Sequence, residues 1–158
     1  MSLNLPHLLS PRRIEIIDKI ESKKSVLDQL ASLLANKQSL LTKYEIFDAL
    51  VAREKLGSTC IGNGIATPRA NINIIHPVAA LLIIKKGLDI ETVDNIPVKI
   101  FLAILIPDNQ KETYSTILQK LNLILTEERN FKIFTETNSQ EYLANYFESL
   151  LSTEIMEK

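Results

Sequence analysis

Two long apolar segments, residues 77–84 and 98–106, constrain this chain more than any other feature. Both are rich in β-branched residues, and neither alternates with polar positions. A strand of this kind needs cover on both of its faces, so such runs are typical of central strands between two layers of helices. We therefore expect an α/β sandwich, in which residues 85–96 form a polar connection between the two strands.

Apolar residues also recur at helical spacing in five other segments. The expected helices begin after Ser22, at the capping box of Thr42 and Glu45, and near residues 111, 129 and the capping box 138–141. The second of these helices should end at Gly57 in the left-handed conformation. A β-branched segment over residues 14–20 predicts a half-buried strand ahead of them all. The inward face of the last helix should carry Tyr142, Leu143, Tyr146, Phe147 and Leu150.

Size and charge exclude several classes of protein. The 158 residues suit one domain, which we place at residues 5–150 with a polar tail over 151–158. The 18 basic and 19 acidic residues nearly cancel, which argues against a nucleic-acid binder. The longest apolar stretch, residues 100–106, is far shorter than the ~20 residues that span a bilayer, so we expect no membrane insertion. The lone Cys60 suits a reducing cytoplasm. The sequence has no Cys/His cluster and no cofactor motif, so we expect neither a metal site nor a cofactor.

Three glycines, Gly57, Gly62 and Gly64, fall within eight residues and predict a loop with unusual backbone angles. The segment around them, residues 53–69, reads REKLGSTCIGNGIATPR. It resembles the signature of the fructose/mannitol/nitrogen-regulatory type of IIA component of the bacterial sugar phosphotransferase system, approximately R-E-x-x-G-S-T-x-I-G-x-G-I-A-I-P-H-G. The segment PVKIFLAILIP at residues 97–107 is similar to the family's P-V strand. The resemblance covers about residues 10–150 and is strongest to the stand-alone nitrogen-regulatory branch.

This resemblance implies a mixed five-stranded sheet with helices on both faces. It also implies that a phosphorylated histidine carrier protein gives its phosphoryl group to a histidine of the IIA protein. The IIA protein then passes the phosphoryl group on or uses it as a regulatory mark. Such chemistry needs an imidazole nitrogen as nucleophile, together with donors around the phosphoryl oxygens.

The chain departs from the family at the acceptor itself. Arg69 stands at the position of the phosphate-accepting histidine, and a guanidinium has no lone pair with which to attack phosphorus. The position of a second family histidine, at the start of the following helix, holds Tyr114, a poor nucleophile at neutral pH. The histidines of the chain are His7 and His76; the second could act as a displaced acceptor or simply be a surface residue.

Two cations remain at the expected site. Arg53 matches the family's arginine, and with Arg69 it could hold a phosphate, a sulfate or a partner's carboxylate. Alternatively, Arg53 bonds carbonyls at its helix end and Arg69 faces solvent. Glu54 could orient Arg53 or be a solvated charge. The residues that we expect to bind an anion or dock a partner are Arg53, Arg69, Ser58, Thr59, Gly62 and Gly64.

Three hypotheses follow from this pattern. The first is a regulatory module that docks protein partners without being phosphorylated; by resemblance these are a histidine phosphocarrier protein, a transporter or a sensor kinase. The second is an active phosphoryl carrier that uses His76 or another acceptor. The third is a sensor of anions or phospho-metabolites built on Arg53 and Arg69.

Overall fold

The two apolar segments form the centre of the sheet. In the computed structural model, which describes residues 8–35 and 41–156, they are β5 (Val78–Leu88) and β6 (Val98–Pro107). These strands are antiparallel, and Leu82 lies opposite Phe101. β1 (Ile14–Ile17) runs parallel to β5 on one side, while β3 (Ile65–Ala66) and β4 (Arg69–Ile72) run parallel to β6 on the other. The expected mixed α/β sheet is confirmed.

The sheet has six strands where five were expected. β3 and β4 both pair with β6, at Ile100 and at Ile104 respectively. They follow one another along the same edge of β6, and the residues between them include Pro68, which has no N–H to donate to a ladder. The Pro68 carbonyl still accepts a hydrogen bond from the Ile104 amide at 3.0 Å. Two short strands therefore pair with this edge of β6 in place of one continuous strand.

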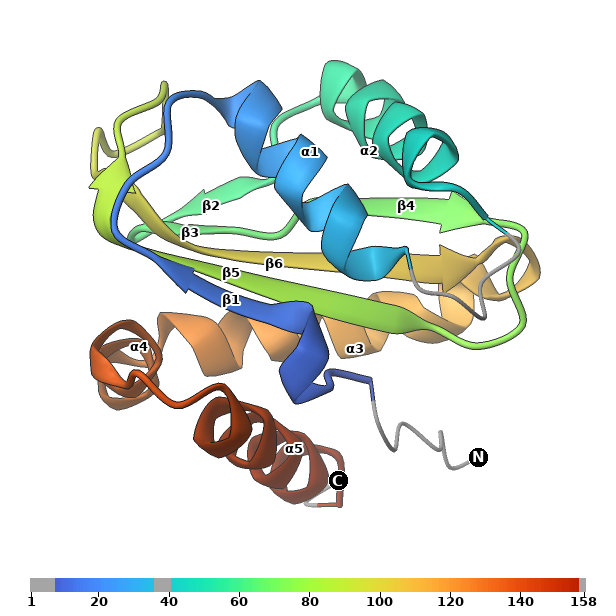
Figure 1. The fold of residues 1–158 in the computed structure, drawn as a ribbon. Helices are drawn as coiled ribbons and strands as arrows, with labels where there is room; N and C mark the ends of the chain where they lie inside the picture. The colour runs from blue at the N-terminus through green and yellow to red at the C-terminus, as the bar shows by residue number, and fades with distance from the viewer. Residues whose placement is uncertain (1–7, 36–40, 157–158) are drawn as a thin grey trace.

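Helices cover both faces of the sheet, which explains why its central strands are apolar throughout (Figure 1). Leu81 and Ile83 pack into one core cluster with helices α3 (Lys111–Thr126), α4 (Glu128–Glu136) and α5 (Gln140–Met156). Leu82 and Ile84 pack into a second cluster with α1 (Lys23–Leu34) and α2 (Lys43–Leu56). Short 3-10 helices, residues 11–13 and 108–110, precede β1 and α3.

The caps predicted for α1 and α2 are confirmed. Ser22 accepts a hydrogen bond on its hydroxyl from the Ser25 amide at 3.1 Å. Thr42 and Glu45 form the capping box in both directions, because each side chain accepts from the other residue's amide. No described helix is long and apolar enough to cross a membrane.

The last helix differs from its prediction in two respects. Its cap is Ser139, whose hydroxyl accepts from the Tyr142 amide at 3.1 Å, so the predicted capping box at 138–141 is wrong by one residue. Tyr142 lies on the outer side of the helix, 52% exposed, although Leu143 and Phe147 are buried as expected. The helix also continues to Met156, past the expected end of the domain at residue 150, and Leu151 lies in the core.

The unusual backbone angles predicted for the glycine-rich segment are confirmed, but the segment forms a hairpin and not only a loop. β2 (Cys60–Gly62) pairs antiparallel with β3, and the turn holds positive φ angles at Gly62 (87°), Asn63 (58°) and Gly64 (80°). Residues 85–88, expected in a polar connection, continue β5, because Leu88 pairs with Val98 and is buried. Strand β4 was not predicted.

Gly57 does not adopt the left-handed conformation that we expected. Its φ of 161° is extended backbone, which any residue can adopt. The end of α2 is closed instead by the Arg53 guanidinium, whose Nη1 donates to the Gly57 carbonyl at 2.9 Å. A side chain one turn back therefore replaces the glycine conformation as the cap.

Gly64→Ala should destabilise the fold, whereas Gly57→Ala should be nearly neutral. A Cβ at Gly64 would lie 3.2 Å from both Phe131 Cζ and the Pro97 carbonyl, and its φ of 80° is strained for alanine. A Cβ at Gly57 would meet nothing within 4 Å. We expect losses of about 1–3 kcal/mol and under about 0.5 kcal/mol respectively, measured as free energies of unfolding in urea. Equal losses would contradict this account of the hairpin.

Candidate functional site

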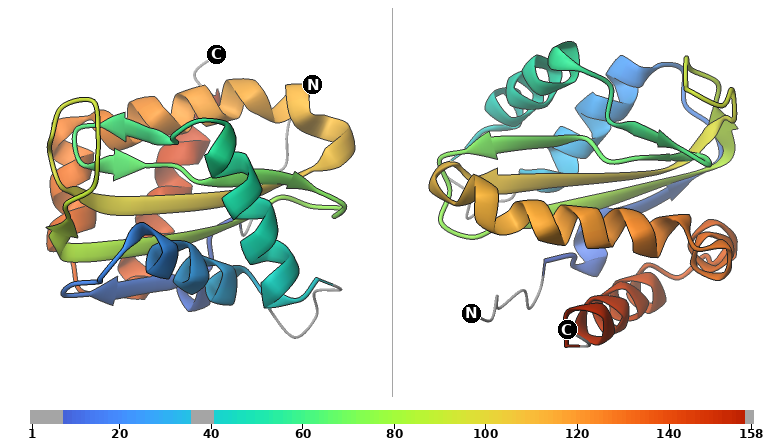
Figure 2. Two further views of the ribbon diagram at one scale, coloured as in Figure 1. Left: turned by 90° about the horizontal axis from the view of Figure 1, so that it is seen from above. Right: turned by 180° about the vertical axis from the view of Figure 1, so that it is seen from behind.

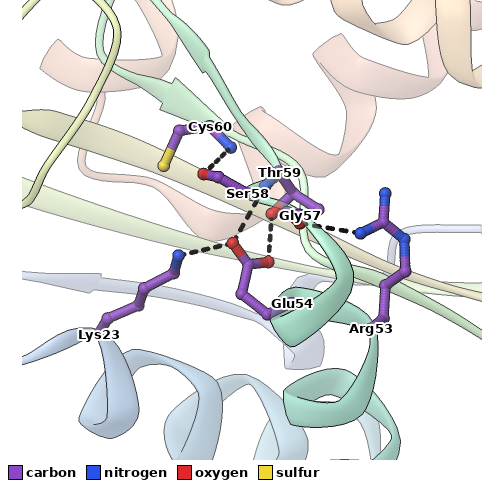
Figure 3. A network of polar contacts seen from close by, with 7 residues as sticks. All are labelled: Lys23, Arg53, Glu54, Gly57, Ser58, Thr59 and Cys60. Atoms are coloured by element: carbon purple, nitrogen blue, oxygen red, sulfur yellow. Dashed lines mark hydrogen bonds and ion pairs between the residues drawn. The ribbon is translucent and has the colours of Figure 1, made fainter.

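Arg53 lies in the last turn of α2 and serves the helix end. Its bond to the Gly57 carbonyl holds the guanidinium at the start of the segment that leads to β2 (Figure 3). The expectation that Arg53 bonds a carbonyl at its helix end is thus confirmed. Among the described residues only Nη1 has an acceptor, so the other N–H groups of the guanidinium remain for another group.

Glu54 binds three donors at the junction of α1, α2 and the signature segment (Figure 3). Its Oε2 accepts from Lys23 Nζ at 2.6 Å and from the Thr59 amide at 3.0 Å, and its Oε1 accepts from the Thr59 hydroxyl at 2.7 Å. The side chain is only 9% exposed. Neither role proposed from the sequence, orienting Arg53 or standing in solvent, is correct. Lys23 lies 31 residues away, and no local pattern signals this pair.

Burial alone would raise the pKa of Glu54. The hydrogen bonds from Lys23 and Thr59, with the charge of Lys23, outweigh that effect and hold the pKa below its usual value. The folded protein therefore favours the ionised carboxylate. The Glu54 charge in turn opposes loss of the proton from Arg69 and so acts to raise the pKa of that guanidinium.

Thr59 and Ser58 both have local partners. Thr59 is 4% exposed and gives both of its donors to Glu54, so it is not available to bind an oxyanion. Its carbonyl accepts from the Thr67 amide at 2.9 Å. Ser58 is exposed, and its hydroxyl oxygen accepts from the Cys60 amide at 3.1 Å, which is local turn bonding to the backbone.

Arg69 is the first residue of β4 and is half-buried. Its guanidinium has no hydrogen bond or ion pair with any residue that the structure describes. Burial and the positive charge of Arg53 both lower its pKa, while Glu54 raises it. An arginine nevertheless stays protonated in proteins. The structure thus brings Arg53 and Arg69 together as two cations, and Glu54, the nearby anion, is already bound by Lys23 and Thr59.

Gly62 and Gly64 do not line this site. The Gly64 carbonyl accepts from the amides of Lys99 and Ile100, whereas Arg69 pairs with Ile104. Four residues of strand separate those positions, a distance of about 13 Å. Gly62 packs against Asp94, whose carboxylate accepts from the Asn63 amide at 2.7 Å. Both glycines serve the hairpin turn instead of an anion pocket.

Tyr114 and His76 lie in different surroundings. Tyr114, at the start of α3, is 8% exposed and lines a small apolar cavity with Ile104, the residue opposite Arg69 in the β4–β6 pair; burial raises its pKa. His76 is exposed in the connection between β4 and β5. Because β4 extends about 10 Å from Arg69 to Ile72, His76 follows the far end of that strand. His7 lies outside the described residues, among which no three His, Cys, Asp or Glu gather as a metal site.

Replacing Glu54 by glutamine should weaken the acid sensitivity of the fold. A carboxylate whose folded pKa lies below its ordinary value of 4.5 contributes stability above that pH and loses it as the pH falls. We therefore expect the free energy of unfolding to drop less between about pH 7 and about pH 3 in Glu54→Gln than in the wild type. Urea titrations at both pH values measure the difference, and Glu148→Gln, at an exposed position of α5, is the control. Equal drops in all three proteins would contradict the role of Glu54.

Comparison with known proteins identifies the family to which this fold and the glycine-rich segment belong. A family model described as phosphoenolpyruvate-dependent sugar phosphotransferase system, EIIA 2, matches residues 7–150. The nitrogen regulatory protein homolog of Haemophilus influenzae is 33% identical over 151 residues, which cover 92% of each chain.

Two solved structures have the same fold. The nitrogen regulatory protein IIA-Ntr of Neisseria meningitidis has a TM-score of 0.80 at 24% identity, with 91% of this chain and 96% of that chain covered. Enzyme IIAMTL of Escherichia coli, solved in complex with phosphorylated enzyme IIBMTL, has a TM-score of 0.70 at 17% identity, with 92% and 97% covered. The two solved structures show the fold. The family model and the Haemophilus influenzae relative show the family. The chain belongs to the EIIA 2 family of the phosphoenolpyruvate-dependent sugar phosphotransferase system.

Proposed function

We propose that this protein is a regulatory module that docks protein partners through the surface around Arg53 and Arg69, and that residue 69 accepts no phosphoryl group. The observation that supports the proposal is Arg69 itself, at the position that the family signature gives to histidine. A guanidinium is cationic and offers no lone pair to phosphorus. The protein would therefore behave as a permanently unphosphorylated form of its family.

The surroundings of Arg69 suit docking better than transfer. Leu56, at the end of α2 and three residues from Arg53, is 85% exposed, and Ser58 beside it is also exposed. An apolar side chain beside fixed cations is a combination that protein interfaces use, with Arg frequent among their strongest contacts. Enzyme IIAMTL, a protein of the same fold, forms a complex with a phosphorylated partner. For this chain we infer that the partner is a protein: another component of the phosphotransferase system, a transporter or a sensor kinase.

The alternative of an active carrier depends on another acceptor. Tyr114 is buried, and its raised pKa makes the phenolate rarer still at neutral pH. His76 is exposed and chemically capable of accepting a phosphoryl group. It has neither Arg53 nor Arg69 beside it to hold the phosphoryl oxygens, because β4 separates it from them.

A phosphotransfer assay separates these functions. Wild-type protein incubated with phosphoenolpyruvate, enzyme I and the histidine phosphocarrier protein should take up no acid-labile phosphoryl group, whereas Arg69→His should take it up. The Haemophilus influenzae relative serves as the positive control for the donor chain. Labelling of the wild type would overturn the proposal, and its loss in His76→Asn would identify the active carrier instead.

Anion binding is a second candidate function. Arg69 is half-buried without a hydrogen-bonded or ionic partner among the described residues, and it lies beside the cation Arg53. Two guanidinium groups in this arrangement can bind the oxygens of one phosphate or sulfate. An ion or a phospho-metabolite would then change the surface that partners meet.

Phosphate should stabilise the folded protein through Arg69. At ten times the dissociation constant, a ligand that binds only the folded state raises the melting temperature of a domain this size by about 3–6 °C. We expect such a rise with inorganic phosphate in the wild type and in Arg12→Ala, a control at an exposed arginine of the 3-10 helix before β1. The rise should disappear in Arg69→Ala. A rise of equal size in all three proteins, or none at millimolar phosphate, would contradict the anion site.

A further inference from the structure

A groove between α1 and α2 shares Lys23 and Glu54 with the polar network described above and is lined by neither Arg53 nor Arg69. The two helices lie over the same face of the sheet (Figure 2, left), and the groove between them has a volume of about 450 Å³. Its apolar wall consists of Leu27 from α1 and of Phe47 and Val51 from α2. Leu27 is buried, whereas Phe47 and Val51 are half-buried and remain open to solvent. The volume lies within the range of about 300–1,000 Å³ that is usual for sites of small molecules.

The charged residues of the groove are mostly cationic. Lys23, Lys24 and Lys55 line it together with Glu54, which leaves a net charge of +2. Lys23 is paired with Glu54 at 2.6 Å, so this pair is already neutral. Lys24 and Lys55 are exposed, and neither has a hydrogen bond or an ion pair with another described residue. Two available ammonium groups therefore stand at the edge of an apolar wall.

The space between the helices limits the kind of occupant. Two ion pairs, Lys23–Glu54 and Asp28–Lys43, connect α1 to α2. The pairs are separated by a rise of about 16.5 Å on α2 but only about 7.5 Å on α1, where the opening is less than the 10–12 Å width of a helix with its side chains. A partner helix would have to break one of these pairs to lie on Leu27. A narrow unbranched chain fits without that loss.

We propose that this groove binds a small amphipathic anion, an unbranched acyl chain that ends in a carboxylate. The chain lies on Leu27, Phe47 and Val51, and the carboxylate is bound by the ammonium groups of Lys24 and Lys55. The site is separate from Arg53 and Arg69 and does not depend on the proposed function.

Sodium decanoate, kept below the concentration at which it forms micelles, is the probe. In titrations of the ¹⁵N-labelled protein we expect saturable shifts of the amide signals of α1 and α2. Octanoate, which lacks two CH₂ groups, should bind about 10- to 15-fold more weakly. Decyltrimethylammonium, which has the same chain and the opposite charge, should produce no saturable shifts in these helices.

Charge-reversal variants test the two lysines. Lys24→Glu/Lys55→Glu should weaken decanoate binding at least tenfold. Lys111→Glu/Lys132→Glu, which changes two exposed lysines of α3 and α4, should leave it within twofold of the wild type. Arg69→Ala should also bind decanoate normally, so this site and the anion site are tested independently.

Three results would each overturn the proposal. One is the absence of saturable shifts in α1 and α2 with decanoate. Another is equal binding of decyltrimethylammonium, which would indicate only a non-specific apolar surface. The last is an equal loss of affinity in both double-lysine variants, which would indicate a general effect of protein charge.

Discussion

The pairing of β5 with β6, buried on both faces, is the constraint on which the rest of this structure depends. Each strand carries apolar side chains on alternate faces, and each face needs its own layer of helices. That requirement places α1 and α2 on one side and α3, α4 and α5 on the other. The other edge of β6 pairs with the short strands β3 and β4. Arg69 is the first residue of β4, so the candidate site lies at this edge of the sheet.

The sequence predicted those parts of the fold that depend on local patterns. Both central strands, the cap of α1 and the capping box of α2 are set by residues within a few positions of one another. The hairpin at residues 60–66 and strand β4 were missed for a common reason. Each is only two to four residues long and is stabilised by neighbours distant in sequence, such as Asp94 for the Asn63 amide. Tyr142 was misplaced because the buried stripe of the last helix is narrower than predicted: Leu143 and Phe147 fill it, and Tyr142 lies beside it.

The candidate site was predictable in its residue types but not in its contacts. The resemblance identified Arg53, Arg69 and the segment between them. It could not reveal that Glu54 binds Lys23, because that pair joins two helices across 31 residues. Nor could it reveal that Thr59 gives both of its donors to Glu54, or that the glycines lie about 13 Å along β6 from Arg69. An expected cluster of six residues is therefore divided between a helix end, a cationic pair and a hairpin turn.

This division explains how the chain can keep the family signature with an arginine at its end. Glu54 and Thr59 connect α2 to α1 and to the hairpin, and Gly64 allows its carbonyl to reach two amides of β6. Each of these residues has a structural role that does not require phosphoryl transfer. The Arg69 side chain, by contrast, has no hydrogen bond or ion pair with any described residue. A change of the side chain at position 69 therefore leaves the hydrogen bonds of Glu54, Thr59 and Gly64 in place.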